Sequence, residues 1–206
     1  MADSRRGKKT ALIMEAAERV FIRQGYNGTR MADIAREAGI GKGTLYDYFS
    51  GKRDIFFRLF ETFFAQTLQV ATGDPGKPAK KLAGAAGLRT FFEGCLRSMG
   101  RASRINSLFL EFWSASLVHE ERHLFLEKFQ TVYGEFRRTV SEIIATGVES
   151  GEFRRDLKVH RLAAALVAVF DGLLVQSWFE PRLDVKGAAL VYIDCMVQGM
   201  RPLPGR

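Results

Sequence analysis

The chain has 206 residues, of which 47% are hydrophobic and 26% charged, a composition typical of a folded globular protein rather than a disordered one. Its two cysteines, Cys95 and Cys195, lie far apart with no CxxC partner, so we interpret them as small buried side chains in a reducing cytosol. The net charge is +8, and residues 1–53 carry 11 Lys and Arg against 6 Asp and Glu. This concentration of positive charge favours an anionic partner, with nucleic acid ahead of membrane.

Helical spacing of apolar residues dominates the first part of the chain. Residues 1–9 are polar and basic, so they are predicted to form a flexible arm, and no secretion signal is expected because no long apolar run follows them. Four helices are predicted over residues 10–24, 30–38, 42–49 and 51–70. Gly25 ends the first helix, Thr29 and Ser50 are the expected N-caps of the second and fourth, and Gly39-Ile-Gly41 is a tight turn.

The clearest break in the chain is Thr72-Gly-Asp-Pro-Gly-Lys-Pro78, where Pro and Gly cluster and the helical pattern stops. Five further helices are predicted after it, over residues 80–99, 105–118, 120–150, 159–179 and 185–200. The fourth helix, which precedes the break, carries a broad apolar stripe that needs packing on more than one side. It is therefore expected to connect two units.

Residues 30–49 have the form of a helix-turn-helix motif, in which two short helices are joined by a glycine turn. The second helix of such a motif enters the major groove of DNA, while the first crosses the backbone. The motif lies within the basic part of the chain, which strengthens the argument from charge.

Three segments and one lysine of this region form a recognisable pattern. They are Phe21-Ile-Arg-Gln-Gly-Tyr-Asn-Gly-Thr29, Ile34-Ala-Arg-Glu-Ala-Gly39, Lys42-Gly-Thr-Leu-Tyr-Asp-Tyr-Phe49 and Lys52. Together they resemble the signature of TetR-family transcriptional regulators over about residues 10–60. The C-terminal part resembles that family only in outline, through its length, its helices and the Gly-Glu-Phe-Arg turn at Gly151.

The resemblance implies an all-α fold with an N-terminal three-helix DNA-binding domain, residues 1–52, and a C-terminal ligand-binding and dimerisation domain, residues 53–206. It implies a cytoplasmic homodimer, most often a repressor, that binds a palindromic double-stranded DNA operator and is released by a small-molecule effector. Neither a cofactor nor an enzymatic activity is expected. The residues themselves are compatible with both a repressor and an activator.

Eight residues are predicted to contact DNA: Thr29, Arg30, Lys42, Gly43, Thr44, Tyr46, Tyr48 and Lys52. The resemblance implies phosphate contacts for Thr29, Tyr46 and Lys52. It implies base contacts around Lys42, Gly43, Thr44 and Tyr48, and the alternative for each residue is surface solvation or core packing. Leu45 and Phe49 are expected to point inward.

Two positions depart from the family pattern. Gly41 stands where a Ser or Thr usually caps the third helix, so one hydroxyl contact to phosphate is expected to be lost. Asp47 puts a carboxylate among the groove-facing residues, where it could accept from a cytosine amino group or face a neighbouring Arg, and we favour the second.

The predicted helix over residues 159–179 is apolar on nearly every face, with small residues along one stripe. Six residues of this helix and the next are predicted to form a dimer interface: Ala164, Ala168, Gly172, Val175, Tyr192 and Met196. The alternative is a simple buried core helix. Within residues 159–179, Leu162–Phe179 is the one candidate membrane span, but Asp171 in its middle would cost roughly 2.5–3.5 kcal/mol in a bilayer, so we interpret the stretch as a helix buried in protein.

Aromatic residues are frequent in the middle helices, and some are expected to line a pocket for an apolar or aromatic effector. The predicted pocket residues are Phe109, Phe112, Trp113, Phe129, Tyr133, Phe170 and Trp178. His119 and His123 have a spacing that could hold a metal on a helix, but no third ligand is evident, so no metal site is predicted.

Three other classes of function are weaker. An enzyme is disfavoured because no Ser-His-Asp set, paired carboxylate box or metal cluster is evident. A structural DNA-binding protein without a ligand is disfavoured by the hundred or so helical residues between the predicted DNA-binding domain, residues 1–52, and the predicted dimer helices. We call this DNA-binding domain the reading head. A membrane-surface protein is disfavoured because its only support is one apolar helix that carries an Asp at its centre.

Overall fold

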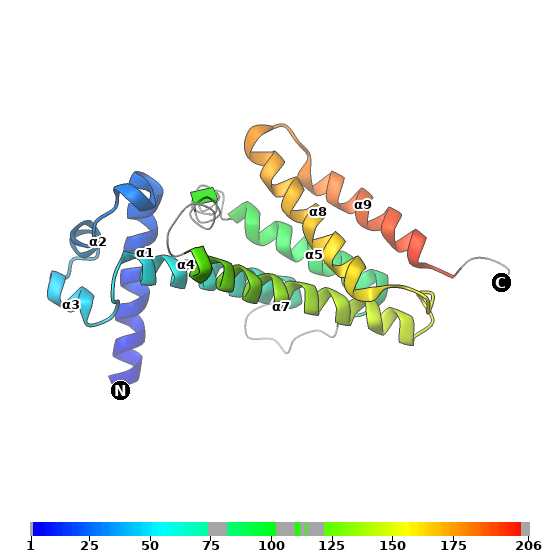
Figure 1. Ribbon diagram of the computed structural model, residues 1–206, viewed down its shortest axis with the longest axis horizontal. Helices are drawn as coiled ribbons and strands as arrows, with labels where there is room; N and C mark the ends of the chain where they lie inside the picture. The colour runs from blue at the N-terminus through cyan, green and yellow to red at the C-terminus, as the bar shows by residue number, and fades with distance from the viewer. Residues whose placement is uncertain (1, 74–81, 102–109, 112–113, 115–121, 203–206) are drawn as a thin grey trace. The chain divides into compact units, whose positions relative to one another are not determined.

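The computed structural model describes residues 2–73, 82–101, 110–111, 114 and 122–202, and all regular structure in these residues is helical (Figure 1). The predicted all-α class is therefore confirmed. The helices are α1 (Ala2–Gly28), α2 (Met31–Glu37), α3 (Lys42–Tyr46), α4 (Lys52–Thr72), α5 (Gly84–Arg101), α7 (Arg122–Glu149), α8 (Val159–Phe179) and α9 (Val185–Met200). The helix predicted over residues 105–118 lies mostly outside the described residues.

Packing divides the chain into two units. The first contains residues 1–64 and 102–129, and the second contains residues 65–101 and 130–206. Two of the three boundaries fall inside long helices, so α4 and α7 contribute residues to each unit, and the third follows the last residue of α5. The predicted boundary after residue 52 coincides with the start of α4, and a functional division at that point stays a prediction.

The first unit is built around a core to which α1, α2, α3 and α4 each contribute. Ile13 and Val20 of α1, Ile34 of α2, Leu45 of α3 and Ile55 of α4 are all 0% exposed. The helices α2 and α3 have only 7 and 5 residues. Isolated helices of that length are unstable in water, so this shared core is what holds the helix-turn-helix together.

The N-terminal end of α1 differs from the prediction. Residues 2–9, predicted to form a flexible arm, are helical, because the Arg and Lys residues of this stretch are good helix formers and no proline interrupts them. The hydroxyl of Thr10 donates to the carbonyl of Arg6 at 3.0 Å, one turn back. At the other end, the predicted stop at Gly25 is confirmed as a break in the helix, with φ 70° and ψ 167°.

The start of α2 also differs from the prediction. Arg30, not Thr29, is the N-cap, and its backbone N–H donates to Asp33 Oδ2 at 3.1 Å. Thr29 is 1% exposed and its hydroxyl donates to the carbonyl of Gly25 at 2.7 Å, so it closes the broken end of α1 instead. The third helix ends at Tyr46, with Asp47 as its C-cap, and is shorter than the predicted 42–49.

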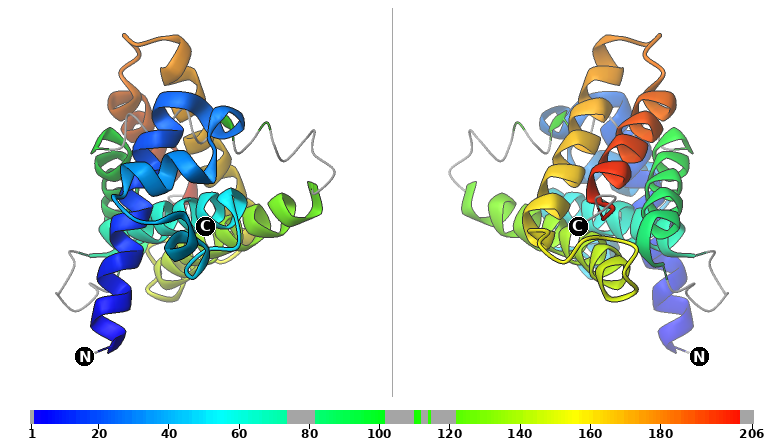
Figure 2. Two further views of the ribbon diagram at one scale, coloured as in Figure 1. Left: turned by 90° about the vertical axis from the view of Figure 1, so that its left-hand side faces the viewer. Right: turned by 90° about the vertical axis from the view of Figure 1, so that its right-hand side faces the viewer.

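The second unit packs α5, α8 and α9 with the C-terminal parts of α4 and α7. Helix α9 packs against both α5 and α8 (Figures 1 and 2). Helix α5 meets the backbone of α4 closely at Gly94, where a Cβ would lie 2.4 Å from the Cα of Ala71. Glycine is therefore required at this helix crossing, because any side chain would push the two backbones apart.

The two cysteines, both predicted to be buried, lie in different settings. Cys95 of α5 is buried as predicted, and burial raises the pKa of its thiol. Cys195 of α9 is exposed, because Ile193 and Val197 on either side of it supply the buried face of that helix. The prediction of burial is therefore wrong for Cys195.

Candidate functional site

The end of α1 and the start of α4 are joined by three aromatic rings. The ring of Tyr26 lies 4.6 Å from that of Phe56 and 5.9 Å from that of Phe21, and Phe21 and Phe56 meet edge to face at 5.3 Å. Pairs at these distances add to the stabilisation that burial of the rings already supplies. The cluster fixes the direction in which the chain leaves α1 toward the helix-turn-helix.

The ammonium group of Lys52 caps the broken end of α1. It donates to the carbonyls of Tyr26 at 2.9 Å, Thr29 at 3.1 Å and Asn27 at 3.4 Å. It also lies 4.6 Å from the centre of the Tyr26 ring, within the range of a cation–π interaction. Partial burial of this amine lowers the pKa of Lys52. The first residue of α4 thus ties α4 to the junction of α1 and α2.

Two of the residues predicted to contact phosphate therefore hold the reading head together. The hydroxyl of Thr29 is buried and already donates to a carbonyl, and the phosphate contact of this residue stays a prediction. Lys52 is only half-buried, but its ammonium donors are directed at protein carbonyls, and its phosphate contact stays a prediction. Sequence reasoning missed this role because backbone carbonyls belong to every residue and leave no signal in the sequence.

The other six predicted contact residues are accessible. Arg30, Lys42, Gly43 and Tyr46 are exposed, and Thr44 and Tyr48 are half-buried. Between them, Leu45 and Phe49 are 0% and 4% exposed and point inward as predicted. The helix α3 therefore buries one face in the core that it shares with α1, α2 and α4, and presents its other face to solvent.

The exposed face of α3 has little bulk near its start. Gly41 is the N-cap, with extended backbone at φ −66° and ψ 146°, and no side chain caps the helix. At Gly43, no described atom lies within 4 Å of the position that a Cβ would take. Packing does not require glycine there, so the open space is available to a ligand that approaches the backbone of α3 closely.

Ion pairs hold α2 against α1. Glu37 of α2 accepts from Arg19 at 2.8 Å and from Arg23 at 3.0 Å, and these bonds lower the pKa of its carboxyl, with the Arg19 contact the larger cause. Asp33 of α2 pairs with Arg36 one turn further along its own helix. Exposed pairs of this kind add little to stability, but they favour a single orientation of α2.

A carboxylate from the later part of the chain also contacts the junction. Glu111 accepts from the backbone N–H of Tyr26 at 2.5 Å, and both residues belong to the first unit. A Cβ at Gly25 would lie 2.8 Å from Glu111 Oε1, so this contact adds a second reason for glycine at the break in α1. The predicted DNA-binding domain is therefore not packed only on itself.

Only some of the predicted effector residues can be located. Phe109, Phe112, Trp113 and the side chain of Trp178 lie outside the described residues. Phe129 belongs to the first unit, where it is 7% exposed and stacks edge to face on Phe60 at 5.1 Å. Tyr133 and Phe170 belong to the second unit. The grouping of all seven residues around one pocket stays a prediction.

Tyr133 of α7 and Asp171 of α8 form a half-buried polar pair. The hydroxyl of Tyr133 is hydrogen-bonded to the carboxyl of Asp171. Burial raises the pKa of Asp171 to about 6, an effect that the hydrogen bond from Tyr133 only partly offsets. Burial also raises the pKa of Tyr133, and the neighbouring carboxyl raises it further. A carboxylate among apolar helices is costly, so its presence marks this position as a candidate for ligand recognition.

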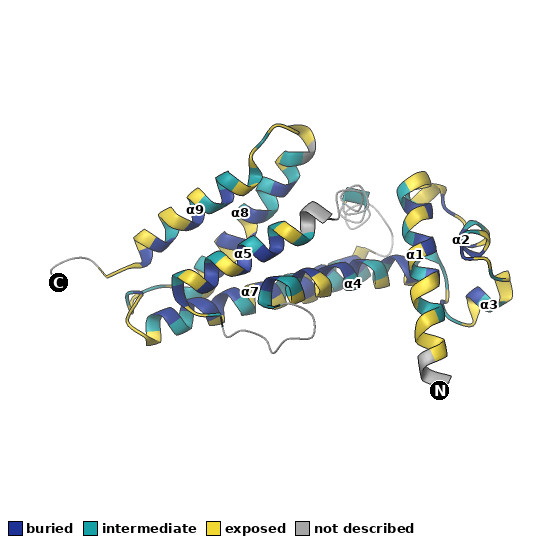
Figure 3. Ribbon diagram, turned by 180° about the vertical axis from the view of Figure 1, so that it is seen from behind, coloured by how far each residue is buried: buried dark blue, intermediate teal, exposed yellow. Residues whose placement is uncertain are grey.

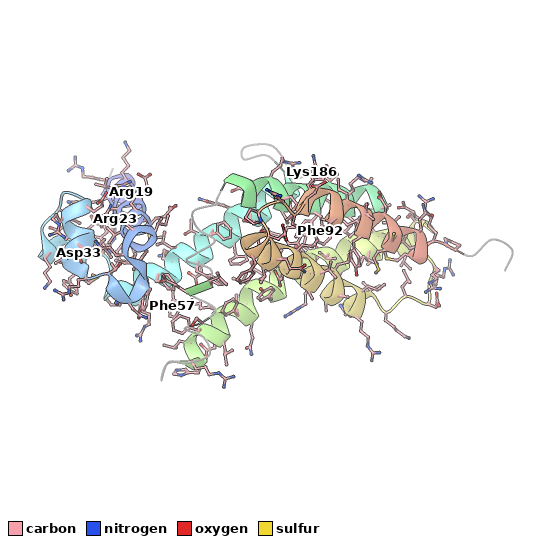
Figure 4. The ribbon with its side chains drawn as sticks, turned by 90° about the horizontal axis from the view of Figure 1, so that it is seen from above. Arg19, Arg23, Asp33, Phe57, Phe92 and Lys186 are labelled. Carbon is pink, nitrogen blue, oxygen red and sulfur yellow. The ribbon has the colours of Figure 1, made fainter. Side chains whose placement is uncertain are left out.

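A small apolar hollow lies between α5, α8 and α9. Its lining is formed by Phe92, Leu166, Val169, Phe170, Leu173, Ala189, Tyr192 and Ile193. The ring of Phe92, labelled in Figure 4, lies 5.6 Å from that of Phe170. The hollow brings the predicted pocket residue Phe170 together with the predicted dimer residue Tyr192, and sequence reasoning did not identify Phe92 as its third aromatic wall.

Helix α8 has a run of small apolar residues that the described residues leave exposed, and most of its larger apolar residues are only half-buried or buried. Residues Val159–Ser177 are long and apolar enough to cross a membrane by length and composition, with a mean hydropathy of 1.5, yet only 22% of this window is buried. Ala164 and Ala168 are exposed, and Gly172, Val175, Tyr192 and Met196 are half-buried. On α9, Val191 is 64% exposed. Figure 3 shows exposed positions along both helices. The alternative of a simple buried core helix does not fit this exposure.

Two family models match this chain. Residues 13–59 match the model described as bacterial regulatory proteins of the tetR family. Residues 84–197 match the model described as the C-terminal part of BetI-type transcriptional repressors. Together the matches cover α1 from residue 13 onward, all of α2 and α3, and most of the second unit.

Curated proteins and solved structures agree with the two models. The HTH-type transcriptional regulator YfiR of Bacillus subtilis is 28% identical over 196 residues, which are 93% of each chain. The HTH-type transcriptional regulator TtgR of Pseudomonas putida is 27% identical over 206 residues, covering 94% of this chain and 92% of TtgR. The structure of SmeT, the repressor of a Stenotrophomonas maltophilia multidrug efflux pump, superposes with a TM-score of 0.73 at 18% identity, covering 96% and 94% of the chains.

Replacing Lys52 tests its structural role. We expect Lys52→Met to lower the free energy of unfolding by about 2–3 kcal/mol, because three carbonyls lose a charged donor. Lys42→Met removes the same charge from an exposed position and is expected to change stability by less than about 0.5 kcal/mol. Chemical denaturation followed by circular dichroism measures both. Equal stabilities of the two variants would contradict the structural role of Lys52.

Replacing Asp171 tests the Tyr133–Asp171 pair through the pH dependence of stability. Because the pKa of its carboxyl rises from 3.8 to about 6 on folding, ionisation destabilises the folded state increasingly from about pH 4 to pH 6. Asp171→Asn removes this penalty while its amide oxygen still accepts from Tyr133. We expect the variant to match the wild type near pH 4 and to exceed it by up to about 3 kcal/mol above pH 6.

Thermal denaturation across this pH range measures the difference, with Asp156→Asn as the control because the side chain of Asp156 is 73% exposed. A gain in stability for Asp171→Asn that is the same at pH 4 and pH 8 would show that the carboxyl has an ordinary pKa.

Proposed function

Because the chain belongs to the TetR family of bacterial regulatory proteins, we propose that it is a cytoplasmic repressor that binds a palindromic operator as a homodimer and releases it on binding a small effector. Family members and curated relatives are transcriptional regulators, not enzymes. The observation that carries the proposal is the exposed face of α3, which presents Lys42, Gly43 and Tyr46 from a buried three-helix core.

Each exposed residue of α3 has chemistry that suits DNA. Lys42, at the start of the helix, can reach a phosphate or a guanine edge, and Gly43 permits close approach to the backbone. The hydroxyl of Tyr46, whose side chain is 49% exposed, can donate to a phosphate. The neighbouring Thr44 can contact phosphate or a thymine methyl group. A recognition helix needs such accessible donors on a rigid support.

The exposed apolar face of α8 and α9 supports a homodimer. Ala164 and Ala168 are small and exposed, and Val191 of α9 is a large apolar residue left largely in solvent. An uncovered apolar surface of this kind marks an interaction site, and small residues let two helices approach closely. A two-fold dimer would present two reading heads to the two halves of a palindromic operator.

The second unit supports an apolar or aromatic effector. Phe92 and Phe170 line an apolar hollow there, and Tyr133 with Asp171 supplies the polar groups that orient a ligand in a site of this kind. SmeT is a repressor of a multidrug efflux pump, and that relative supports repression as the mode of action. The effector can release DNA only if it binds the DNA-free conformation more tightly than the DNA-bound one.

Selection from genomic DNA tests operator binding. Purified protein is incubated with sheared genomic DNA from the source organism, and the retained fragments are sequenced. We expect enrichment of a few sites that share an inverted repeat, and loss of that enrichment in the double variant Lys42→Ala, Tyr46→Ala, because base and phosphate contacts each contribute about 1–3 kcal/mol. Lys186→Ala, which removes an exposed lysine of α9, is the control and is expected to behave as the wild type. Enrichment that survives the double variant would refute the role of α3.

A charge placed on the small-residue face tests the homodimer. We expect Ala168→Glu to turn the dimer into a monomer, because two buried carboxylates would repel each other across the two-fold axis. Ala86→Glu adds the same charge to an exposed position of α5 and is expected to leave the dimer intact. Sedimentation velocity measures both. A wild type that sediments as a monomer, or an Ala168→Glu variant that remains a dimer, would contradict the proposed interface.

A further inference from the structure

The first turns of α1 carry a concentration of positive charge that the helix-turn-helix does not use. Arg5, Arg6, Lys8 and Lys9 lie within residues 2–9, against the single acid Asp3. Arg5, Arg6 and Lys8 are exposed and Lys9 is half-buried. Figures 1 and 2 show this end of α1 extending beyond α2 and α3 of the same unit. Because the stretch is helical, each basic side chain projects from a defined side of α1.

Arg6, although exposed, lies on the same side of α1 as the buried residues further along the helix. Residues seven apart share a face of an α-helix, and Ile13 and Val20, which are fully buried, lie seven and fourteen residues after Arg6. The face of α1 that packs on the core therefore points Arg6 toward the rest of the unit. Its guanidinium lies 5.3 Å from the centre of the Tyr48 ring, which follows α3. This cation–π contact joins the basic end of α1 to the reading head.

The other three cations occupy the neighbouring surface of the helix. At 100° per residue, Lys8, Arg5, Lys9 and Arg6 follow one another around less than half of the circumference. Three of these side chains are therefore presented together, next to the one that contacts Tyr48. A strip of positive charge extends from the recognition helix along α1.

From this arrangement we infer that the basic end of α1, residues 2–9, is a second DNA-contacting element that neutralises backbone phosphates beside the bases read by α3. Arg6 sets its position through Tyr48, and Arg5, Lys8 and Lys9 supply the phosphate contacts. The inference rests on the proposed function, because it assigns this strip to the same duplex that α3 binds. It adds affinity without adding sequence preference, since phosphates carry no base information.

Duplex DNA fits this strip better than an anionic membrane surface. A helix that binds a membrane interface needs an apolar face with large residues opposite its basic one. Residues 2–9 contain no large apolar side chain, and Leu12, just beyond them, is 42% exposed. The contact with Tyr48 also keeps the strip beside a helix whose accessible face suits a DNA groove.

The salt dependence of DNA affinity tests the inference. Fluorescence anisotropy measures Kd for the selected operator and for a short duplex of mixed sequence over a series of potassium chloride concentrations. The slope of log K against log salt reports how many phosphates the protein neutralises. We expect the triple variant Arg5→Gln, Lys8→Gln, Lys9→Gln to reduce that slope by about 0.9 for each phosphate that a subunit no longer neutralises, on both duplexes. Its preference for operator over mixed sequence is expected to stay unchanged.

A matched variant controls for overall charge. Arg138→Gln, Arg155→Gln and Arg182→Gln remove the same charge from exposed positions of the second unit and are expected to keep the wild-type slope. A slope that falls equally in both triple variants, or in neither, would overturn the inference. A wild type that binds both duplexes equally, with a slope that falls only in the first variant, would refute the proposed operator binding but not the strip.

A membrane contact gives a different outcome. Sedimentation with vesicles of phosphatidylserine and phosphatidylcholine in equal parts measures it. Vesicle binding that disappears in the first triple variant, with an unchanged salt slope on DNA, would assign the strip to membranes and overturn the inference. Circular dichroism and the thermal midpoint verify that each variant is folded.

Discussion

The reading head depends on the hydrogen bonds that the ammonium group of Lys52 donates to backbone carbonyls. The break at Gly25 leaves carbonyls at the end of α1 without helical partners, and Lys52 donates to three carbonyls in this region while stacking on Tyr26. Thr29 closes the same end through its hydroxyl. Buried carbonyls without donors are costly, so the direction in which the chain enters α2 follows from this cap.

Residues that hold the reading head and residues that face solvent alternate within one short stretch. Leu45 and Phe49 fix α3 to the core, and between them Tyr46 and Tyr48 remain accessible to different degrees. The helix α3 has too few residues to be stable alone, so its orientation is that of the core beneath it. The same core sets the direction of α1, and its basic end is therefore held beside α3 instead of moving as a free arm.

Helix α8 meets three different environments, which explains why it is apolar on nearly every face. Ala163 and Leu166 are buried in the second unit, whereas Ala164 and Ala168 are exposed on the surface that we propose for the dimer. Asp171 is the exception, and its hydrogen bond to Tyr133 of α7 keeps a carboxyl in an otherwise apolar setting. A single helix thus supplies part of the core, the surface that we propose for the dimer and the carboxyl that we propose for ligand recognition.

The sequence by itself determined the all-α class, the helix-turn-helix and the bounds of α8 and α9, because apolar periodicity and the stop at Gly25 are local signals. Charge-rich residues 2–9 carry no apolar period, so the signal that located the other helices did not extend to them, and their helix propensity was overlooked. Only the tertiary structure decided that Lys52 caps α1 and that Asp171 meets Tyr133. The carbonyl partners of Lys52 are 23–26 residues away and belong to the backbone, which every residue shares. A polar side chain takes the partner that folding brings within reach, and residue type alone does not specify that partner.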